Sequence, residues 1–315
     1  MWRRRRCRAL PVTEQERRKP VLEGFRGFEH RHVPCADVGI HAVVGGQGPA
    51  LLLLHGHPQT CVIWHKVAAT LARHFTVVAA DLRGYGDSDK PAGLPGHDNY
   101  SKRTMARDQV ELMAALGFER FRVMAHDRGA RVAHRMALDH GERVERLVTL
   151  DIAPTLAMYE QTSLAFATAY WHWFFLIRPA PFPETLIEAD PALYLRSAMG
   201  ARSAGLAPFT EAAMAEYLRC LQSPGAAHGL CEDYRASAGI DLQHDRADLA
   251  AGRMVECEML ALWGEQGAVG QCFRPLDEWR KVARRVSGHG LPCGHYIAEE
   301  APELLLETAL PFLRG

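Results

Sequence analysis

The chain has 315 residues, of which 48% are hydrophobic and 23% charged, with 37 basic and 37 acidic side chains. This composition is typical of a folded globular protein and excludes a disordered, collagen-like or low-complexity chain. No apolar run reaches the roughly 20 residues of a membrane span, and a net charge of zero argues against a general nucleic-acid binder.

The N-terminal segment is strongly basic, because residues 1–20 hold eight arginines and lysines against two glutamates. It has no apolar stretch of the length that a secretory signal needs, so we predict that residues 1–24 form a disordered basic extension. A basic arm that contacts a partner is the alternative. Since the rest of the chain is acidic, any positive charge that binds an acidic substrate must be local.

The eight cysteines are scattered and form no CxxC pair. This pattern favours a reduced, cytoplasmic protein over a disulfide-stabilised one.

Strands and helices alternate from about residue 28. The run LLLLH at 51–55 is continuously apolar, as expected of a strand that is buried on both faces of a parallel sheet. Further strands are predicted at 40–44, 75–80, 121–125 and 146–150, and helices at 62–73, 100–116 and 129–140. This order of elements predicts an open, mostly parallel sheet flanked by helices.

The alternation stops after residue 152. Residues 153–252 contain no convincing strand and many Pro, Trp and Tyr residues, which predicts an inserted helical cap. A strand at 258–263 and helices at 276–285 and 301–313 resume the first pattern. We therefore predict a core built from 25–152 and 253–315, interrupted by a cap at 153–252.

Asp127 lies at the junction between a predicted strand and a predicted helix, in the sequence AHDRG. In a turn of this type the central side chain projects above the sheet and acts as a nucleophile. A carboxylate needs no activating base at neutral pH. Its attack on a saturated carbon leaves an ester that water can cleave. The pattern predicts displacement at a carbon–halogen bond or an epoxide, with a helix-capping aspartate as the alternative.

His295 is the predicted base for the second step, because it lies in the loop LPCGHY between the last strand and the last helix. It would deprotonate the water that attacks the Asp127 ester. Asp151, at the end of VTLD, is the predicted acid that orients the imidazole, and Glu265 is the fallback.

Arg128 and Arg131 lie three residues apart on the predicted helix, so they share a face beside Asp127. Two guanidiniums can hold a carboxylate by charge-assisted hydrogen bonds and offset its repulsion from the nucleophile. This arrangement favours a short 2-halo acid over a neutral substrate. Two solvated helix arginines are the alternative.

These features resemble the haloacetate (fluoroacetate) dehalogenases of the α/β-hydrolase fold superfamily. The resemblance extends over nearly the whole chain from about residue 25 and includes ADLRGYGDSDKP, HDRGARV, LDIAPT, CEDYRA and GHYIAEEAPE. HDRGARV is the most specific, because related epoxide hydrolases and haloalkane dehalogenases typically place a tryptophan after the nucleophile. The resemblance implies an α/β-hydrolase fold: a mostly parallel open sheet flanked by helices, with an inserted helical cap.

The resemblance also implies roles for single residues. It supports Asp127, His295 and Asp151 as catalytic residues and Arg128 and Arg131 as the carboxylate-binding pair, and it adds a halide pocket formed by His172, Trp173 and Tyr234. Without the resemblance, these last three would be read as aromatic packing within the cap.

His57 departs from the family pattern, in which an aromatic residue such as phenylalanine commonly follows His-Gly in the front loop. Its backbone N–H can still serve an oxyanion hole together with that of Arg128, because the side chain is not the donor.

The expected function is hydrolysis of a haloacetate (fluoro-, chloro- or bromoacetate) to glycolate and halide through a covalent aspartyl ester, without a cofactor. The alternatives are an epoxide hydrolase with the same catalytic residues and a non-catalytic protein that binds carboxylates. A zinc site at His289, Cys293 and His295 is a further alternative, although no additional ligand cluster is visible. The expected partners are the haloacid and water, with no nucleic acid or membrane. The resemblance is compatible with a homodimer.

Overall fold

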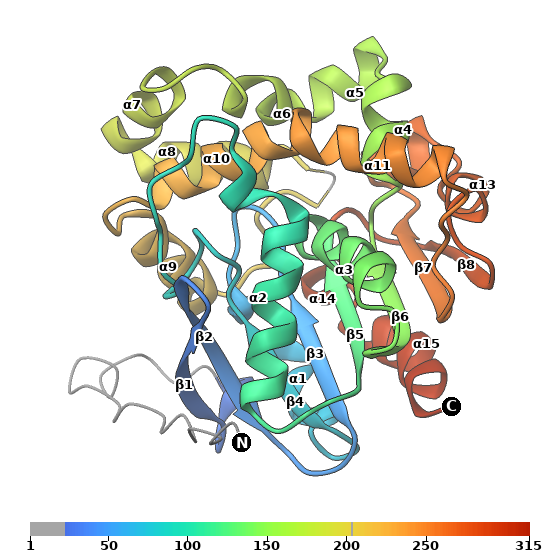
Figure 1. Ribbon diagram of the computed structural model, residues 1–315. Helices are drawn as coiled ribbons and strands as arrows, with labels where there is room; N and C mark the ends of the chain where they lie inside the picture. Colours follow the sequence, from blue (N-terminus) through green and yellow to red (C-terminus); the bar gives the residue numbers. More distant parts are fainter. Residues whose placement is uncertain (1–22, 203) are drawn as a thin grey trace, which may run out of the picture.

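The computed structural model describes residues 23–202 and 204–315, and within these residues the centre is an eight-stranded sheet (Figure 1). The strands are β1 (Glu29–Cys35), β2 (Val38–Gly45), β3 (Ala50–Leu54), β4 (Thr76–Ala80), β5 (Phe121–His126), β6 (Val144–Leu150), β7 (Glu258–Gly264) and β8 (Val286–Leu291). Their order is β1-β2-β4-β3-β5-β6-β7-β8. Strand β2 pairs antiparallel with β1 and β4, and all other neighbours are parallel. The predicted fold class is confirmed.

The middle of the sheet is apolar on both faces because helices cover both. Residues 51–54 of β3 have no exposed surface. Helices α2 (Lys102–Ala115) and α3 (Asp127–Asp139) lie in front of the sheet in Figure 1, and α15 (Pro302–Arg314) lies behind it. Helix α15 buries Leu305, Ala309 and Leu313, which are spaced four apart and so form one apolar stripe.

Two predicted helices are shorter than expected. The segment 62–73 divides into the 3-10 helix η3 (Cys61–Lys66) and α1 (Ala68–Leu71). The segment 276–285 ends early as α13 (Pro275–Arg280), because Ala283 pairs with Val255 beside the sheet. The strand β1, which pairs along its whole length with β2, was not predicted from the sequence.

Between β6 and β7 the chain forms the helices α4 to α11, which we call the cap helices and which lie above the sheet in Figure 1. They are α4 (Thr155–Glu160), α5 (Leu164–Ala169), α6 (Trp171–Leu176), α7 (Phe182–Ala189), α8 (Pro191–Gly200), α9 (Glu211–Leu221), α10 (Ala226–Ala238) and α11 (Ile240–Ala250).

The remaining elements are short: η2 (Glu23–Phe25), η4 (Asp98–Tyr100), α12 (Ala268–Cys272) and α14 (Ile297–Glu300). Residues 1–22 of the predicted basic extension lie outside the described residues. Over the part that the structure describes, no helix is both long and apolar enough to cross a membrane.

Candidate active site

Asp127 stands where β5 passes directly into α3, and its φ of 43° is left-handed. Few residues other than glycine adopt this conformation without strain. The turn fits only because its neighbours are small: a Cβ on Gly56 would lie 2.6 Å from that of Asp127, and one on Gly129 would lie 2.4 Å from the His55 carbonyl oxygen. The sharp turn that the sequence predicts is therefore present.

The Asp127 carboxylate is buried and only partly hydrogen-bonded. The His57 backbone N–H donates to Oδ2 over 3.2 Å, whereas Oδ1 has no hydrogen-bond partner among the described residues. Burial alone would raise the pKa of Asp127, but the His295 imidazole and the guanidiniums of Arg131 and Arg128 hold it well below its usual value. The group is therefore ionised, and one of its oxygens has no hydrogen-bond partner among the described residues.

His295 and Asp151 form a hydrogen-bonded pair beside Asp127. The distance from His295 Nδ1 to Asp151 Oδ2 is 2.6 Å, and the other Asp151 oxygen accepts the Gly264 N–H over 2.8 Å. Asp151 directly follows β6 and has a φ of 49°. Because β6 pairs with β5, which precedes Asp127, the two carboxylates stand at the ends of adjacent strands. The fallback acid, Glu265, is exposed and makes no such bond.

The other imidazole nitrogen of His295, Nε2, is buried without a partner in the described part of the chain. Burial lowers the pKa of His295 well below its usual value, and the nearby Arg202 guanidinium lowers it further. Because the imidazole is neutral and Asp151 holds Nδ1, its Nε2 can accept a proton.

Arg128 is completely buried and bound to the cap. Its Nε and Nη2 each lie 2.8 Å from an oxygen of Asp233 in α10, and its Nη1 has no partner within the described residues. Its Cζ lies 4.0 Å from the centre of the Tyr234 ring. The same Asp233 carboxylate also contacts Lys102. The alternative interpretation of Arg128 as a solvated surface arginine is therefore wrong.

Arg131 is also buried, but its described side-chain contacts include no carboxylate in an ion pair. Its Nη1 donates to the Ala153 carbonyl and to Thr155 Oγ1, and its Nη2 lies 3.2 Å from Met158 Sδ. Its Nε–H has no partner there. Each arginine thus leaves one nitrogen without a partner among the described residues, and two buried guanidiniums near one another favour the binding of a negatively charged group.

His172 and Trp173 of α6 and Tyr234 of α10 come together next to these arginines. The Tyr234 ring centre lies 5.8 Å from that of His172 and 6.3 Å from that of Trp173. Trp173 Nε1 and the Tyr234 hydroxyl are buried and lack partners among the described residues. Arg131 packs on the Trp173 ring with its Cζ 4.7 Å from the centre.

His57 lies against the same group. Its ring stacks on that of His172 at 5.2 Å between centres, and its Nε2 lies 3.1 Å from the Tyr194 hydroxyl. Burial lowers the pKa of His57 to about 3, so the ring is neutral at ordinary pH.

Three residues near the site were not predicted from the sequence. Asp233 holds Arg128, and the Tyr170 hydroxyl lies 3.3 Å from His295 Nδ1. Arg202 places its Cζ 4.2 Å from the centre of the Tyr170 ring. Only Asp233 had a signal in the sequence, because it directly precedes Tyr234 in CEDYRA.

The described residues offer metal-ligand groupings only away from Asp127, such as His41, Cys61 and Asp81. The Asp81 oxygens already accept hydrogen bonds from the Cys61 backbone N–H and from His41 Nδ1, so this donor set is satisfied by the protein itself. His289 is exposed in β8 whereas His295 is buried. The alternative zinc set of His289, Cys293 and His295 does not come together in the described structure.

A family profile for the alpha/beta hydrolase fold matches residues 49–204. A fluoroacetate dehalogenase from Burkholderia sp is 48% identical over 280 residues, which cover 89% of this chain and 91% of that protein. The chain belongs to the α/β-hydrolase family. The predicted resemblance to the fluoroacetate dehalogenases is confirmed by this relative.

Other α/β hydrolases are also similar. A soluble epoxide hydrolase from Corynebacterium sp. (strain C12) is 37% identical and covers 95% of this chain and 98% of its own. Among solved structures, a chain described as an α/β hydrolase from Nostoc sp PCC 7120 has a TM-score of 0.89 and 53% identity, covering 92% of this chain and 99% of its own. These relatives support a hydrolase and include both dehalogenase and epoxide hydrolase names.

Proposed function

We propose that this α/β hydrolase converts a haloacetate and water to glycolate and halide through an ester of Asp127. One observation carries the proposal: six of the buried polar atoms that lack partners among the described residues lie on the residues that this reaction needs. They are Asp127 Oδ1, His295 Nε2, Arg128 Nη1, Arg131 Nε, Trp173 Nε1 and Tyr234 Oη. Buried polar atoms are nearly always paired, so such a group is best explained by a bound molecule.

In the first step, the free Asp127 oxygen attacks the carbon that bears the halogen. The new C–O bond forms as the carbon–halogen bond breaks, and the electron pair leaves with the halide. Arg128 Nη1 and Arg131 Nε hold the substrate carboxylate, which fixes the carbon in line with the nucleophile. Trp173 and Tyr234, with His172, donate hydrogen bonds to the departing halide.

In the second step, water attacks the carbonyl carbon of the Asp127 ester. His295 Nε2 takes the proton from the water, and Asp151 stabilises the resulting imidazolium. The His57 backbone N–H, already directed at Asp127 Oδ2, stabilises the negative charge that develops on this carbonyl oxygen of the ester. Collapse of this intermediate releases glycolate, whose new hydroxyl takes the proton from His295, and the second proton of the water leaves the Asp127 carboxyl group for solvent, which regenerates the carboxylate.

The charge of the site favours an anionic substrate over an epoxide. Arg131 makes no direct ion pair among the described side chains, although the nearby Asp127 carboxylate acts on its charge, and a substrate carboxylate would give it a direct partner that a neutral epoxide cannot. The epoxide hydrolase remains a second candidate because of the Corynebacterium relative. Halide release from chloroacetate, compared with diol formation from styrene oxide by the same preparation, separates the two functions.

The covalent step is tested by a single turnover of chloroacetate in heavy-oxygen water, with enzyme in excess. Hydrolysis at the ester carbonyl should leave one labelled oxygen in the peptide that contains Asp127, detected by mass spectrometry. Label found only in glycolate would mean direct attack by water and would contradict the proposal. Asp127→Asn should release no halide, which makes it the matched control.

A further inference from the structure

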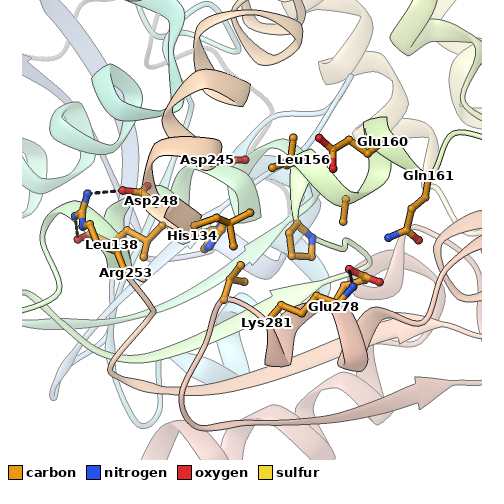
Figure 2. Close-up of a pocket in the computed structure, with 14 residues that line it drawn as sticks. His134, Leu138, Leu156, Glu160, Gln161, Asp245, Asp248, Arg253, Glu278 and Lys281 are labelled. Carbon is orange, nitrogen blue, oxygen red and sulfur yellow. Dashed lines mark hydrogen bonds and ion pairs between the residues drawn. The ribbon is translucent and has the colours of Figure 1, made fainter. Parts of the chain in front are cut away.

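The side chains proposed for the reaction are closed off from solvent, because none of them is more than 2% exposed. The hollow between α3, α4, α11 and α13 does not open onto them, since no residue of the proposed site lines it (Figure 2). Its basic residues Arg253 and Lys281 are paired with Asp248 and Glu278. This hollow therefore offers an anionic substrate neither a way to Asp127 nor an unpaired basic side chain.

The charge of the rest of the chain does not attract an anion either. The whole chain is neutral and residues 1–20 hold six more basic than acidic side chains, so the remainder is acidic. Arg128 and Arg131 are buried, and Asp233 binds Arg128 directly. Attraction of an anion from solution therefore needs another cation, which lies close to the site and also reaches the surface.

Arg202, in the segment between α8 and α9, has both properties. Its Cζ lies 4.2 Å from the centre of the Tyr170 ring, and the Tyr170 hydroxyl lies 3.3 Å from His295 Nδ1. Unlike Arg128 and Arg131, the residue is partly exposed, and its nitrogens are not among the buried polar atoms that lack a partner. Arg202 thus joins the site to the surface of the cap.

The charge of Arg202 is held in place but not paired. The guanidinium lies on the face of the Tyr170 ring, a contact that leaves its N–H groups available for the oxygens of an anion. Burial alone would lower the pKa of Arg202, whereas the neighbouring tyrosines and the Asp127 carboxylate hold it above its usual value. No described carboxylate makes an ion pair with it. The side chain is therefore charged, and its field reaches the nucleophile.

We propose that Arg202 is the entry residue of the site, the cation that attracts a haloacid from solution and brings it to Arg128 and Arg131. The inference rests on the proposed function and deepens it, because it makes the uptake of the substrate selective for anions. Arg202 binds the substrate on its way in and takes no part in the bond changes at Asp127.

The proposal is tested by the dependence of kcat/KM for chloroacetate on ionic strength, from about 20 to 500 mM. Buffer salt sets the ionic strength, because chloride is a product. In the original chain kcat/KM should fall as salt screens Arg202. Arg202→Met keeps a long unbranched side chain without the charge. It should lower kcat/KM about five- to tenfold at low ionic strength, mostly through KM, and remove most of the salt dependence.

Two further variants serve as controls. Arg202→Lys keeps the charge and should retain most of the kcat/KM at low ionic strength. Arg196→Met makes the same change as Arg202→Met at an exposed position of α8 and should behave like the original chain. All assays are run at pH 8, where the His295 imidazole is neutral with or without Arg202, since burial is the main cause of its low pKa.

Three results would overturn the role of Arg202: a kcat/KM that Arg202→Met leaves unchanged, an equal loss at every ionic strength, or an equal loss in Arg202→Lys. If Arg202→Met does not fold, the original chain decides, and a kcat/KM that does not fall with ionic strength overturns the role.

Failure of the proposed function gives a different result, because the original chain would then release no halide from chloroacetate. The role of Arg202 is decided in that case by calorimetry with acetate, an unreactive carboxylate. Arg202→Met should weaken acetate binding about five- to tenfold at low ionic strength. Equal binding by both proteins, or no binding by the original chain, would overturn the role of Arg202 as well.

Discussion

Replacement of Asp233 by asparagine should destabilise the fold strongly, because this single carboxylate holds two buried cations. Asp233 and Arg128 have no exposed surface, and the Lys102 side chain is 4% exposed. Asparagine keeps the shape but leaves both positive charges without their main counter-charge. Removing one partner of a buried ion pair costs about 3–5 kcal/mol, and we expect a loss in the free energy of unfolding within this range.

The loss is measured by urea unfolding followed by circular dichroism, with Asp37→Asn as the matched control. Asp37 also binds an arginine, Arg83, in a two-bond contact, but its side chain is 54% exposed. Its replacement should cost no more than about 1 kcal/mol, because water replaces the lost partner and Arg83 keeps Asp108. A loss for Asp233→Asn as small as that for Asp37→Asn would refute the argument that burial makes the Asp233 contacts indispensable.

Three further predictions follow from the site and its histidines. Arg131→Lys should raise the KM for chloroacetate about tenfold to hundredfold in a halide-release assay, because the ammonium cannot reproduce the free Nε–H; an unchanged KM would remove Arg131 from the carboxylate site. Since burial lowers the pKa of His295, ester hydrolysis in single-turnover experiments should keep its rate as the pH falls through 6.5, and a rate that halves near pH 6.5 would contradict a buried base. Burial lowers the pKa values of His126 and His134 to about 3, so the unfolded chain binds protons below pH 6.5 that the folded chain does not. The free energy of unfolding should therefore fall as the pH drops from 6.5 towards 3, by up to about 1.4 kcal/mol per pH unit for each residue. In urea titrations at pH 7 and 5.5, His134→Phe should show a smaller loss of unfolding free energy between the two pH values than the original chain.

The sequence alone predicts the parts of the site that depend on which strand, turn or helix follows which along the chain. A buried strand followed at once by a small-residue turn places Asp127, and the next parallel strand places Asp151 at the same edge of the sheet. Because the carboxyl ends of parallel strands meet at this edge, the positions of both acids along the chain were enough to predict that they lie near His295.

The contacts that join the core to the cap could not be predicted in this way. Asp233 is 105 residues from Arg128, and neither sequence period nor spacing indicates that they meet. The pairing of Tyr194 with His57 spans 137 residues and depends on the same packing of the cap helices on the core. The division of the predicted helix 62–73 also reflects packing, since nearly all of η3 is buried beside the sheet.

The left-handed backbones of Asp127 and Asp151 mean that the two proposed catalytic acids occupy positions where the fold itself would favour glycine. Each such conformation costs a residue other than glycine about 1–3 kcal/mol. Selection for heat resistance alone would therefore favour glycine at both positions and remove both carboxylates that the proposed reaction needs. Directed evolution of this scaffold for stability needs activity in the screen from the first round.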